Sequence, residues 1–352
     1  MRRSGAASWR SVAVTAMVTV AVGVGGSGTA SASVPDTTRL GDVTGTGIHN
    51  TYDKGKFSTL TAALDTLTST GDTGPKLLEL DVWTLWSRWL VSHDLPVLPI
   101  DNNNCTSGST RNQDLGVCLS NLASWHAAHP NHAPIIVKIE MKNGFAASSG
   151  FGPAQFDALL TAKLGTAALY RPVDLLTQAG GSRYANLAAA AAADNWATLT
   201  AARGRFMVLV QTGTFEAANP LDTLHTDVEY GTYLASHVDA ATAFPVVLRN
   251  GATGDPRAAY AASLQPWFVS IDTDAVGFAA LPAATRAWYA AGHLWVVATD
   301  VDQVPPALSA TSPTSAQAVA RVALMACDQA SIASSDWAAV PAWYVAFARG
   351  SC

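Results

Sequence analysis

Four short segments in the first half of the chain carry side chains that could perform chemistry together. They are GIHNTY at 47–52, LELDVW at 78–83, LVSHD at 90–94 and VKIEMK at 137–142. Their chemically useful members are two histidines, one amide and three carboxylates: His49, His93, Asn50, Glu79, Asp81 and Glu140. Oxygen donors of this kind bind hard cations, and histidines can move a proton. The set predicts a metal site that acts on a phosphate group.

The spacing of the carboxylates indicates a shared interior. Residues two apart in a strand lie on the same face, so Glu79 and Asp81 should point the same way. Glu140 interrupts the apolar run 135–141 near its end. Like charges buried side by side need a cation or a proton to compensate them. Three carboxylates and the amide oxygen of Asn50 suit calcium, whereas magnesium usually takes fewer protein ligands.

The elements that must position these residues form a regular alternation. Apolar, strand-like runs lie before His49 and at 76–83, 89–93, 134–141, 205–211, 244–249, 267–272 and 293–299. Helix-like segments lie between them, at 59–68, 115–128, 154–164, 197–202 and 282–291. This alternation predicts an α/β fold with a largely parallel sheet, and seven or eight units favour a closed barrel. No glycine-rich nucleotide-binding turn follows the first strand-like run.

The first 32 residues are typical of a secretory signal peptide. A basic start is followed by an apolar run at 12–24 and by the small residues Ala30, Ser31 and Ala32. We therefore predict a signal peptide at 1–32 and one barrel domain at 33–352, exported and without a transmembrane segment. Removing 1–32 takes away three arginines and no acids, which moves the formal charge from −5 to −8. Nucleic acid is excluded as a partner on this charge.

The four cysteines fit an oxidising compartment. They allow three pairings, and the pairs closest in sequence are Cys105 with Cys118 and Cys327 with Cys352. No CxxC pair occurs, so metal binding by these thiols is not expected. We expect disulfides and favour these closest pairings, while the other two connectivities stay open.

The four segments resemble the catalytic half of calcium-dependent phosphatidylinositol-specific phospholipase C, in the secreted bacterial branch of that family. The segment NLASWHAAHPNHAPIIVKIEMK is also similar to that branch, and the resemblance covers roughly residues 42–145. It implies a single TIM-like (β/α) barrel, regular or distorted, of the phospholipase C phosphodiesterase type. It implies calcium ligation by Asn50, Glu79, Asp81 and Glu140, and action of His49 and His93 on the phosphate.

The resemblance also implies the reaction. Calcium would lower the pKa of the inositol 2-hydroxyl, which attacks the phosphorus and releases diacylglycerol and a cyclic inositol phosphate. His93 would protonate the departing oxygen and His49 would stabilise a phosphoryl oxygen, with Glu79 as the candidate general base. Lys142 is predicted to reach a phosphate and Lys138 to neutralise a carboxylate inside the barrel.

Two other functions stay open on the sequence. One is a glycerophosphodiester or sphingomyelin-type phosphodiesterase on the same barrel, although that pattern typically has arginine where this chain has Asn50. The other is a non-catalytic secreted protein that binds a lipid or inositol. The substrate is expected at a membrane surface, and no obligate protein partner is evident.

Several other residues have two possible roles each. Arg249 at a strand end is predicted either to contact the lipid headgroup or to be an exposed strand-end arginine. Trp83, Trp86 and Trp89 lie beside the expected mouth of the site and could enter a lipid interface or pack in a hairpin. Two groups of three histidines lie outside the four segments. The first is expected at the solvated surface and the second lacks metal-ligand spacing: His126, His129 and His132, and His225, His237 and His293.

Overall fold

The structure is a computed structural model and describes residues 34–96 and 103–352. The predicted signal peptide at 1–32 lies outside these residues. In the described part, no helix has the length and apolar composition needed to cross a membrane.

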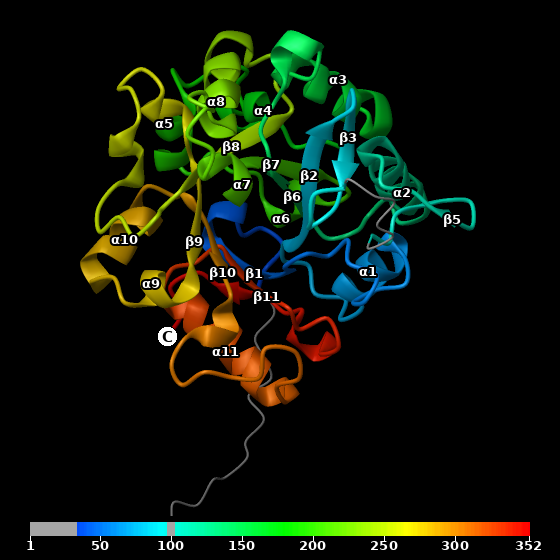
Figure 1. Cartoon of the computed structure of the whole chain (residues 1–352). Coiled ribbons are helices and arrows are strands. Elements are labelled where there is room, and N and C mark those ends of the chain that lie inside the picture. Colours follow the sequence, from blue (N-terminus) through cyan, green and yellow to red (C-terminus); the bar gives the residue numbers. More distant parts are fainter. Residues whose placement is uncertain (1–33, 97–102) are drawn as a thin grey trace, which may run out of the picture. The chain divides into compact units, whose positions relative to one another are not determined.

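Eight parallel strands form the centre of the fold (Figure 1). In order around the barrel they are β1 (Val43–Ile48), β2 (Lys76–Leu85), β6 (Ile135–Met141), β7 (Phe206–Thr212), β8 (Ala243–Leu248), β9 (Ser270–Asp274), β10 (Trp295–Thr299) and β11 (Ile332–Ser335). Each strand pairs in parallel with the next, and β11 pairs with β1. The sheet is therefore closed, and the prediction of a TIM-like barrel is confirmed.

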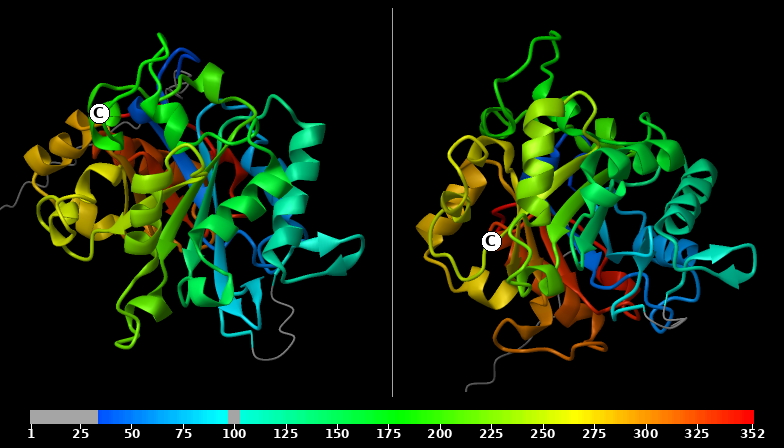
Figure 2. Two further views of the ribbon diagram at one scale, coloured as in Figure 1. Left: turned by 90° about the horizontal axis from the view of Figure 1, so that it is seen from above. Right: turned by 45° about the horizontal axis from the view of Figure 1, so that its top comes forward.

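Helices surround the strands, as the view from above in Figure 2 shows. The longer ones are α1 (Leu60–Leu67), α2 (Leu115–Ala128), α3 (Pro153–Leu164), α8 (Thr226–His237), α10 (Ala283–Ala291) and α11 (Ser315–Cys327). The shorter ones are α4 (Pro172–Leu176), α5 (Leu187–Ala192), α6 (Leu199–Ala202), α7 (Thr214–Ala217) and α9 (Ala275–Ala279). Six 3₁₀ turns are described: η1 (Leu40–Asp42), η2 (Ala147–Ser149), η3 (Pro256–Ala259), η4 (Gln265–Trp267), η5 (Val301–Gln303) and η6 (Pro341–Trp343).

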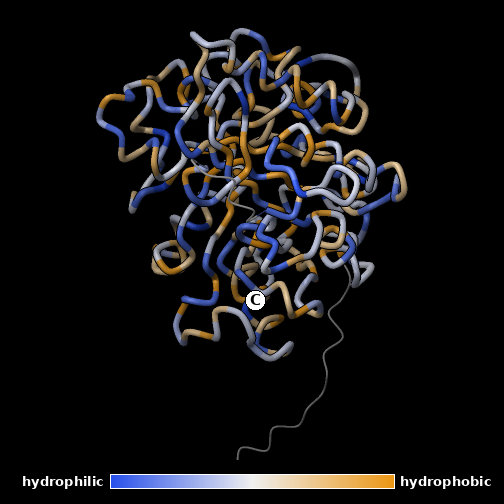
Figure 3. The backbone as a smooth tube through the Cα atoms, turned by 45° about the vertical axis from the view of Figure 1, so that its right-hand side comes forward, coloured by the Kyte–Doolittle hydropathy of each residue, from blue (hydrophilic) through white to orange (hydrophobic). Residues whose placement is uncertain are grey.

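The residue types explain where the helices begin and why the strands lie inside. Every residue of β1, β6 and β7 is buried, as expected for strands covered on both faces. Figure 3 shows hydrophobic segments running through the middle and hydrophilic segments in many of the outer loops. The helices that flank the motifs start at side-chain caps. Thr59 accepts a hydrogen bond from the Ala62 amide, and Asp114 accepts one from the Gly116 amide.

The predicted strand at 89–93 is a strand but not part of the barrel. It is β3 (Arg88–Val91), which pairs antiparallel with the far end of β2. The two-residue turn between them holds Trp86 and Ser87 at φ 50° and 55°, the left-handed conformation that tight hairpins need. The eighth barrel strand is β11, which the sequence did not reveal because its four residues, Ile-Ala-Ser-Ser, form no apolar run. β12 (Phe347–Ala348) pairs with β1, and β4 (Thr106–Ser107) pairs with β5 (Thr110–Arg111).

Both predicted disulfides are present, Cys105 with Cys118 and Cys327 with Cys352. The first fixes the segment before α2 to that helix. The second joins the end of α11 to the last residue of the chain. All four cysteines are therefore used in structural bonds.

The expectation that three neighbouring histidines are solvated is wrong for one of them. His132 is buried between Trp125 and Phe206, with ring centroids at 4.9 Å and 5.2 Å. Its Nδ1 lies 2.6 Å from the Ala133 carbonyl oxygen. The chain turns after α2 and enters β6, and this turn places the ring at the end of the barrel where the strands begin. Burial lowers the pKa of His132 to about 4, so the ring is neutral there.

Candidate active site

The turn after β1 is bonded to the neighbouring strand β2. Asn50 adopts a left-handed φ of 49°, which asparagine tolerates better than most residues. Its backbone amide donates to Glu79 Oε2 at 3.2 Å. Thr51 Oγ1 accepts from the Glu79 amide at 3.1 Å and donates to the Ile48 carbonyl at 2.7 Å. These bonds set the end of β1 against the carboxylates of β2.

Three carboxylates meet inside the barrel. Glu79 and Asp81 come from β2 and Glu140 comes from β6, and all three are buried. Asp81 and Glu140 are direct partners in the parallel pairing of the two strands. One oxygen of each of the three carboxylates lies within 4.8 Å of the other two. Burial, together with the charges of Glu79 and Glu140, raises the pKa of Asp81 to about 7. The structure thus brings together the carboxylates that the sequence predicted.

Two acceptors beside this cluster lack a donor. Asn50 Oδ1 and Asp81 Oδ1 are both inaccessible to solvent, and neither accepts a hydrogen bond from the described part of the chain. Unsatisfied buried acceptors are costly unless another group, such as a cation, meets them. Carboxylate and amide oxygens are the donors that calcium takes. The residues present therefore fit a calcium ion.

Two lysines reach the same cluster. Lys138 Nζ lies 3.1 Å from Glu79 Oε1 and also forms an ion pair with Asp272. Although burial opposes the effect, Lys138 and His49 hold the pKa of Glu79 below its usual value. Lys142 Nζ lies 3.0 Å from Glu140 Oε1 and 3.4 Å from Asp81 Oδ2. Lys138 thus neutralises carboxylates inside the barrel, as predicted.

His49 lies at the edge of the cluster, between acidic groups. Its Nε2 is 3.7 Å from Glu79 Oε2, and its Nδ1 is 3.4 Å from Asp336 Oδ1. Lys56 Nζ binds Asp336 Oδ1 at 2.7 Å and the His49 carbonyl at 2.6 Å. Burial lowers the pKa of His49, but Asp336 and Glu79 outweigh it and raise the pKa to about 9. Sequence reasoning missed Asp336, which follows β11 directly, because it did not recognise that strand.

His93 is not in the cluster. It follows β3, and 58% of its side chain is exposed. Its Nδ1 lies 3.4 Å from Asp94 Oδ1. Its neighbour Ser92 donates its amide to the Asp81 carbonyl at 3.0 Å, so the backbone before His93 runs beside the carboxylates. No described hydrogen bond or ion pair joins His93 to the other predicted site residues.

Arg249 differs from one of its two predicted positions, and Tyr52 is a site residue that the predictions did not include. Arg249 is buried after β8, so an exposed strand-end position is wrong. Its guanidinium donates to Thr273 Oγ1 at 2.6 Å, to the Ala252 carbonyl at 2.8 Å and to Asp274 Oδ2 at 3.2 Å: all three partners lie in neighbouring loops and strands of this chain. Tyr52, which no prediction named, donates its hydroxyl to Asp81 Oδ2 at 3.1 Å.

Comparison with known proteins agrees with this geometry. The family model described as "Phosphoinositide phospholipase C, Ca2+-dependent" matches residues 95–270. A Ca2+-dependent phosphatidylinositol-specific phospholipase C from Streptomyces antibioticus is 39% identical, with a TM-score of 0.80 over 89% of this chain and 100% of that chain.

A more distant solved structure supports the fold alone, and no curated protein matches the chain. A calcium-dependent phosphoinositol-specific phospholipase C from a Pseudomonas species is 20% identical, with a TM-score of 0.62 over 89% of this chain and 96% of that chain. Because the family model spans half of the chain and the Streptomyces enzyme aligns over its whole length, this protein belongs to the Ca2+-dependent phosphoinositide phospholipase C family and is a phosphodiesterase.

Proposed function

We propose that this protein is an exported calcium-dependent enzyme that cleaves the glycerol–phosphate bond of phosphatidylinositol. The products would be diacylglycerol and a cyclic inositol phosphate. One observation carries the proposal: three buried carboxylates converge beside the unpartnered amide oxygen of Asn50, with His49 at their edge. Both disulfides and the predicted signal peptide support export.

Four residues are proposed to hold the calcium ion: Asn50, Glu79, Asp81 and Glu140. When bound, calcium supplies the positive charge that makes the inositol 2-hydroxyl more acidic. Glu79 is proposed as the base that accepts the proton of this hydroxyl as its oxygen attacks the phosphorus. The attack forms a bond between the inositol 2-oxygen and phosphorus and breaks the bond from phosphorus to the glycerol oxygen.

The two histidines are proposed to have separate roles at the phosphate and at the departing oxygen. His49 is proposed to donate a hydrogen bond to a phosphoryl oxygen, and the carboxylates around it favour the charged ring that this role needs. His93 is proposed to give a proton to the departing glycerol oxygen, and its exposed ring can exchange protons with water.

Two cations are proposed to contact the substrate. Lys142 reaches the cluster from the end of β6 and would bind the phosphate. Arg249 follows β8 on the same end of the barrel, and its predicted headgroup contact would require it to exchange Asp274 or Ala252 for the substrate.

The lipid surface is proposed to meet the loops at the carboxyl ends of β2 and β7. Five exposed apolar side chains lie in these loops: Trp86, Leu95, Phe215, Leu221 and Leu224. The rings of Trp83 and Phe215 are 5.3 Å apart, so the β2–β3 hairpin and α7 lie against each other. A formal charge of −8 without residues 1–32 gives no general attraction to an anionic membrane, and apolar contact is the remaining source of binding.

The test measures release of water-soluble inositol phosphate from phosphatidylinositol vesicles, with calcium or with a chelator. Phosphatidylcholine, sphingomyelin and glycerophosphoinositol are assayed in parallel. We expect calcium-dependent release from phosphatidylinositol alone, with the cyclic product identified by phosphorus NMR. Turnover of only another substrate would support the related phosphodiesterase instead, and no turnover would support a binding protein.

Variants test the residue roles. His49→Ala and His93→Ala should each lose at least about 100-fold in rate, the usual contribution of acid–base catalysis. His129→Ala, at an exposed histidine that follows α2 at the end of the barrel where the strands begin, is the matched control. Wild-type rates in the folded His49 and His93 variants would refute these roles.

A further inference from the structure

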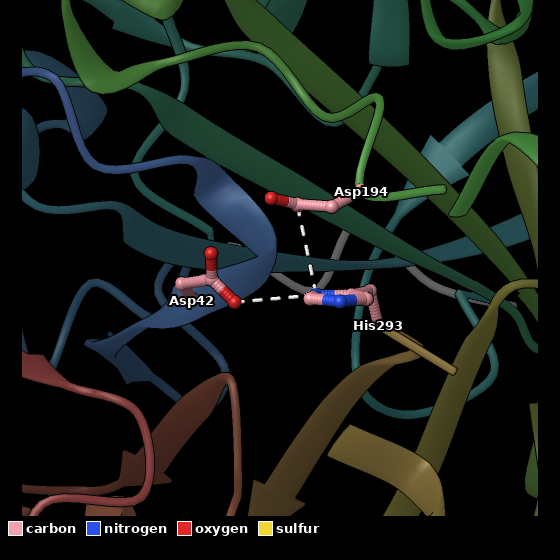
Figure 4. A group of neighbouring side chains, drawn as sticks. All are labelled: Asp42, Asp194 and His293. Carbon is pink, nitrogen blue, oxygen red and sulfur yellow. Dashed lines mark ion pairs between the residues drawn. The ribbon is translucent and has the colours of Figure 1, made fainter. Parts of the chain in front are cut away.

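A second group of possible metal ligands lies at the opposite end of the barrel from the carboxylate cluster. Asp42 ends η1 directly before β1, and His293 lies two residues before β10. Asp194 lies in the turn after α5. All three are thus on the side where the strands begin, and Figure 4 shows their side chains pointing toward one another. They are distant in sequence, which is why His293 had no recognisable ligand spacing.

The donor atoms are close but not hydrogen-bonded. His293 Nδ1 lies 3.2 Å from Asp42 Oδ1 and 3.5 Å from Asp194 Oδ1. Both His293 Nδ1 and Asp194 Oδ1 are inaccessible to solvent, and neither has a hydrogen-bond partner among the described residues. These atoms meet only as ion-pair contacts between partly exposed side chains, without hydrogen-bond geometry, and a cation between them would be coordinated by all three residues.

The separations match a tetrahedral ion. With metal–ligand bonds of about 2.0–2.2 Å, neighbouring ligands of a tetrahedral zinc lie roughly 3.4 Å apart, the edge of the tetrahedron. The two observed nitrogen–oxygen distances bracket this value. One donor atom of each residue also lies within 4.8 Å of the other two. Three ligands on one side leave a fourth position for water.

The surroundings hold the three ligands in place. Arg39 Nε contacts Asp194 Oδ2 at 3.3 Å, which leaves Oδ1 of the same carboxylate facing His293. Trp196 Nε1 donates to the His293 carbonyl at 2.9 Å. The Asp42 carbonyl accepts from the Arg349 amide at 2.8 Å. Such outer contacts are the usual means of fixing the orientation of metal ligands.

We propose that Asp42, Asp194 and His293 form a structural site for a divalent transition-metal ion of the zinc class. Imidazole nitrogen suits zinc and cobalt, whereas calcium takes six to eight oxygen donors and would not be satisfied here. The ion would tie together three segments that no disulfide joins: η1, the turn after α5 and the start of β10. The amino-terminal end of a barrel usually carries stability rather than chemistry. The site is independent of the proposed catalytic function.

The test uses cobalt as a spectroscopic substitute for zinc, on the full chain with excess calcium to fill the catalytic site. We expect one equivalent of cobalt with the visible absorption of a four-coordinate ion, displaced by zinc. His293→Gln and Asp194→Asn should each abolish this absorption. His237→Gln, at an exposed histidine on α8, should not. Zinc should raise the Tm of the wild type but not of His293→Gln.

The alternative without a metal is an ion pair in which a protonated His293 bridges two aspartates. In that case the wild type takes up no cobalt. The proposal is also overturned if cobalt binds with the same stoichiometry and spectrum in both the His293 and Asp194 variants, because the ion would then lie elsewhere, for example at the contacting rings of His126 and His132. Calcium-dependent turnover of phosphatidylinositol should be the same in the wild type and in His293→Gln.

Discussion

Lys142 competes with the proposed calcium ion for the same carboxylates. Its ammonium lies 3.0 Å from Glu140 Oε1 and 3.4 Å from Asp81 Oδ2. An incoming divalent cation must displace this ammonium and will repel it. The displaced lysine can then bind the phosphate of the substrate. Lys142→Met should therefore bind calcium more tightly than the wild type, while it catalyses the reaction more slowly.

The size of the effect follows from the bond that calcium must break. A hydrogen bond to a charged group contributes about 1.5–3 kcal/mol. The Lys142–Glu140 bond at 3.0 Å is such a bond. If methionine removes it in advance, calcium affinity should rise by that amount, which is about 10- to 150-fold at 1.4 kcal/mol per factor of ten. The contact with Asp81 is longer, and we add nothing for it.

Isothermal titration with calcium in the absence of lipid measures this effect without relying on turnover. Lys163→Met, at an exposed lysine on α3, is the control and should keep the wild-type affinity. Thermal unfolding with calcium present establishes that both variants are folded. Equal or weaker calcium binding by folded Lys142→Met would show that the ammonium does not compete for the site.

Three further predictions follow from other residues. Trp86→Ala should weaken binding to phosphatidylinositol vesicles in a flotation assay, whereas Trp288→Ala, on α10 outside the proposed membrane-facing loops, should not. Tyr52→Phe removes a hydrogen bond to Asp81 and should weaken calcium binding about 10- to 100-fold by titration, as for other residues behind metal ligands; an unchanged affinity would contradict this. Because burial lowers the pKa of His132 to about 4, its neutral ring stabilises the fold above pH 6.5, and this stability is lost as the pH falls toward 4. Denaturant unfolding should show a loss of about 3 kcal/mol over that range that is absent in a His132→Gln variant.

The carboxylate cluster was predictable because each of its members is marked locally in the sequence. Glu79 and Asp81 alternate with apolar residues in one strand, and Glu140 interrupts another. Parallel pairing of β2 with β6 then places Asp81 directly beside Glu140. Two elementary rules, the two-residue period of a strand and the common edge of parallel strands, were enough.

Other features depend on contacts that no local pattern encodes. β11 is short and contains small residues, so its strand and the adjoining Asp336 were both missed. The partners of Arg249 lie in loops after β8 and β9, which only the closed barrel brings together. His132 was taken as solvated because it follows a helix end. Its burial arises from the turn back into β6, a tertiary effect.

The net charge of the buried side chains around the cluster affects the stability of the whole fold. Six buried side chains take part, four acidic and two basic: Glu79, Asp81, Glu140, Asp272, Lys138 and Lys142. When all are ionised they leave two negative charges in the barrel interior, and one calcium ion carries two positive charges. A bound calcium ion would offset this excess of negative charge, and uncompensated charge inside a protein is strongly unfavourable. Calcium would then be a component of the folded interior as much as a reagent, and its removal should lower the Tm even when no substrate is present.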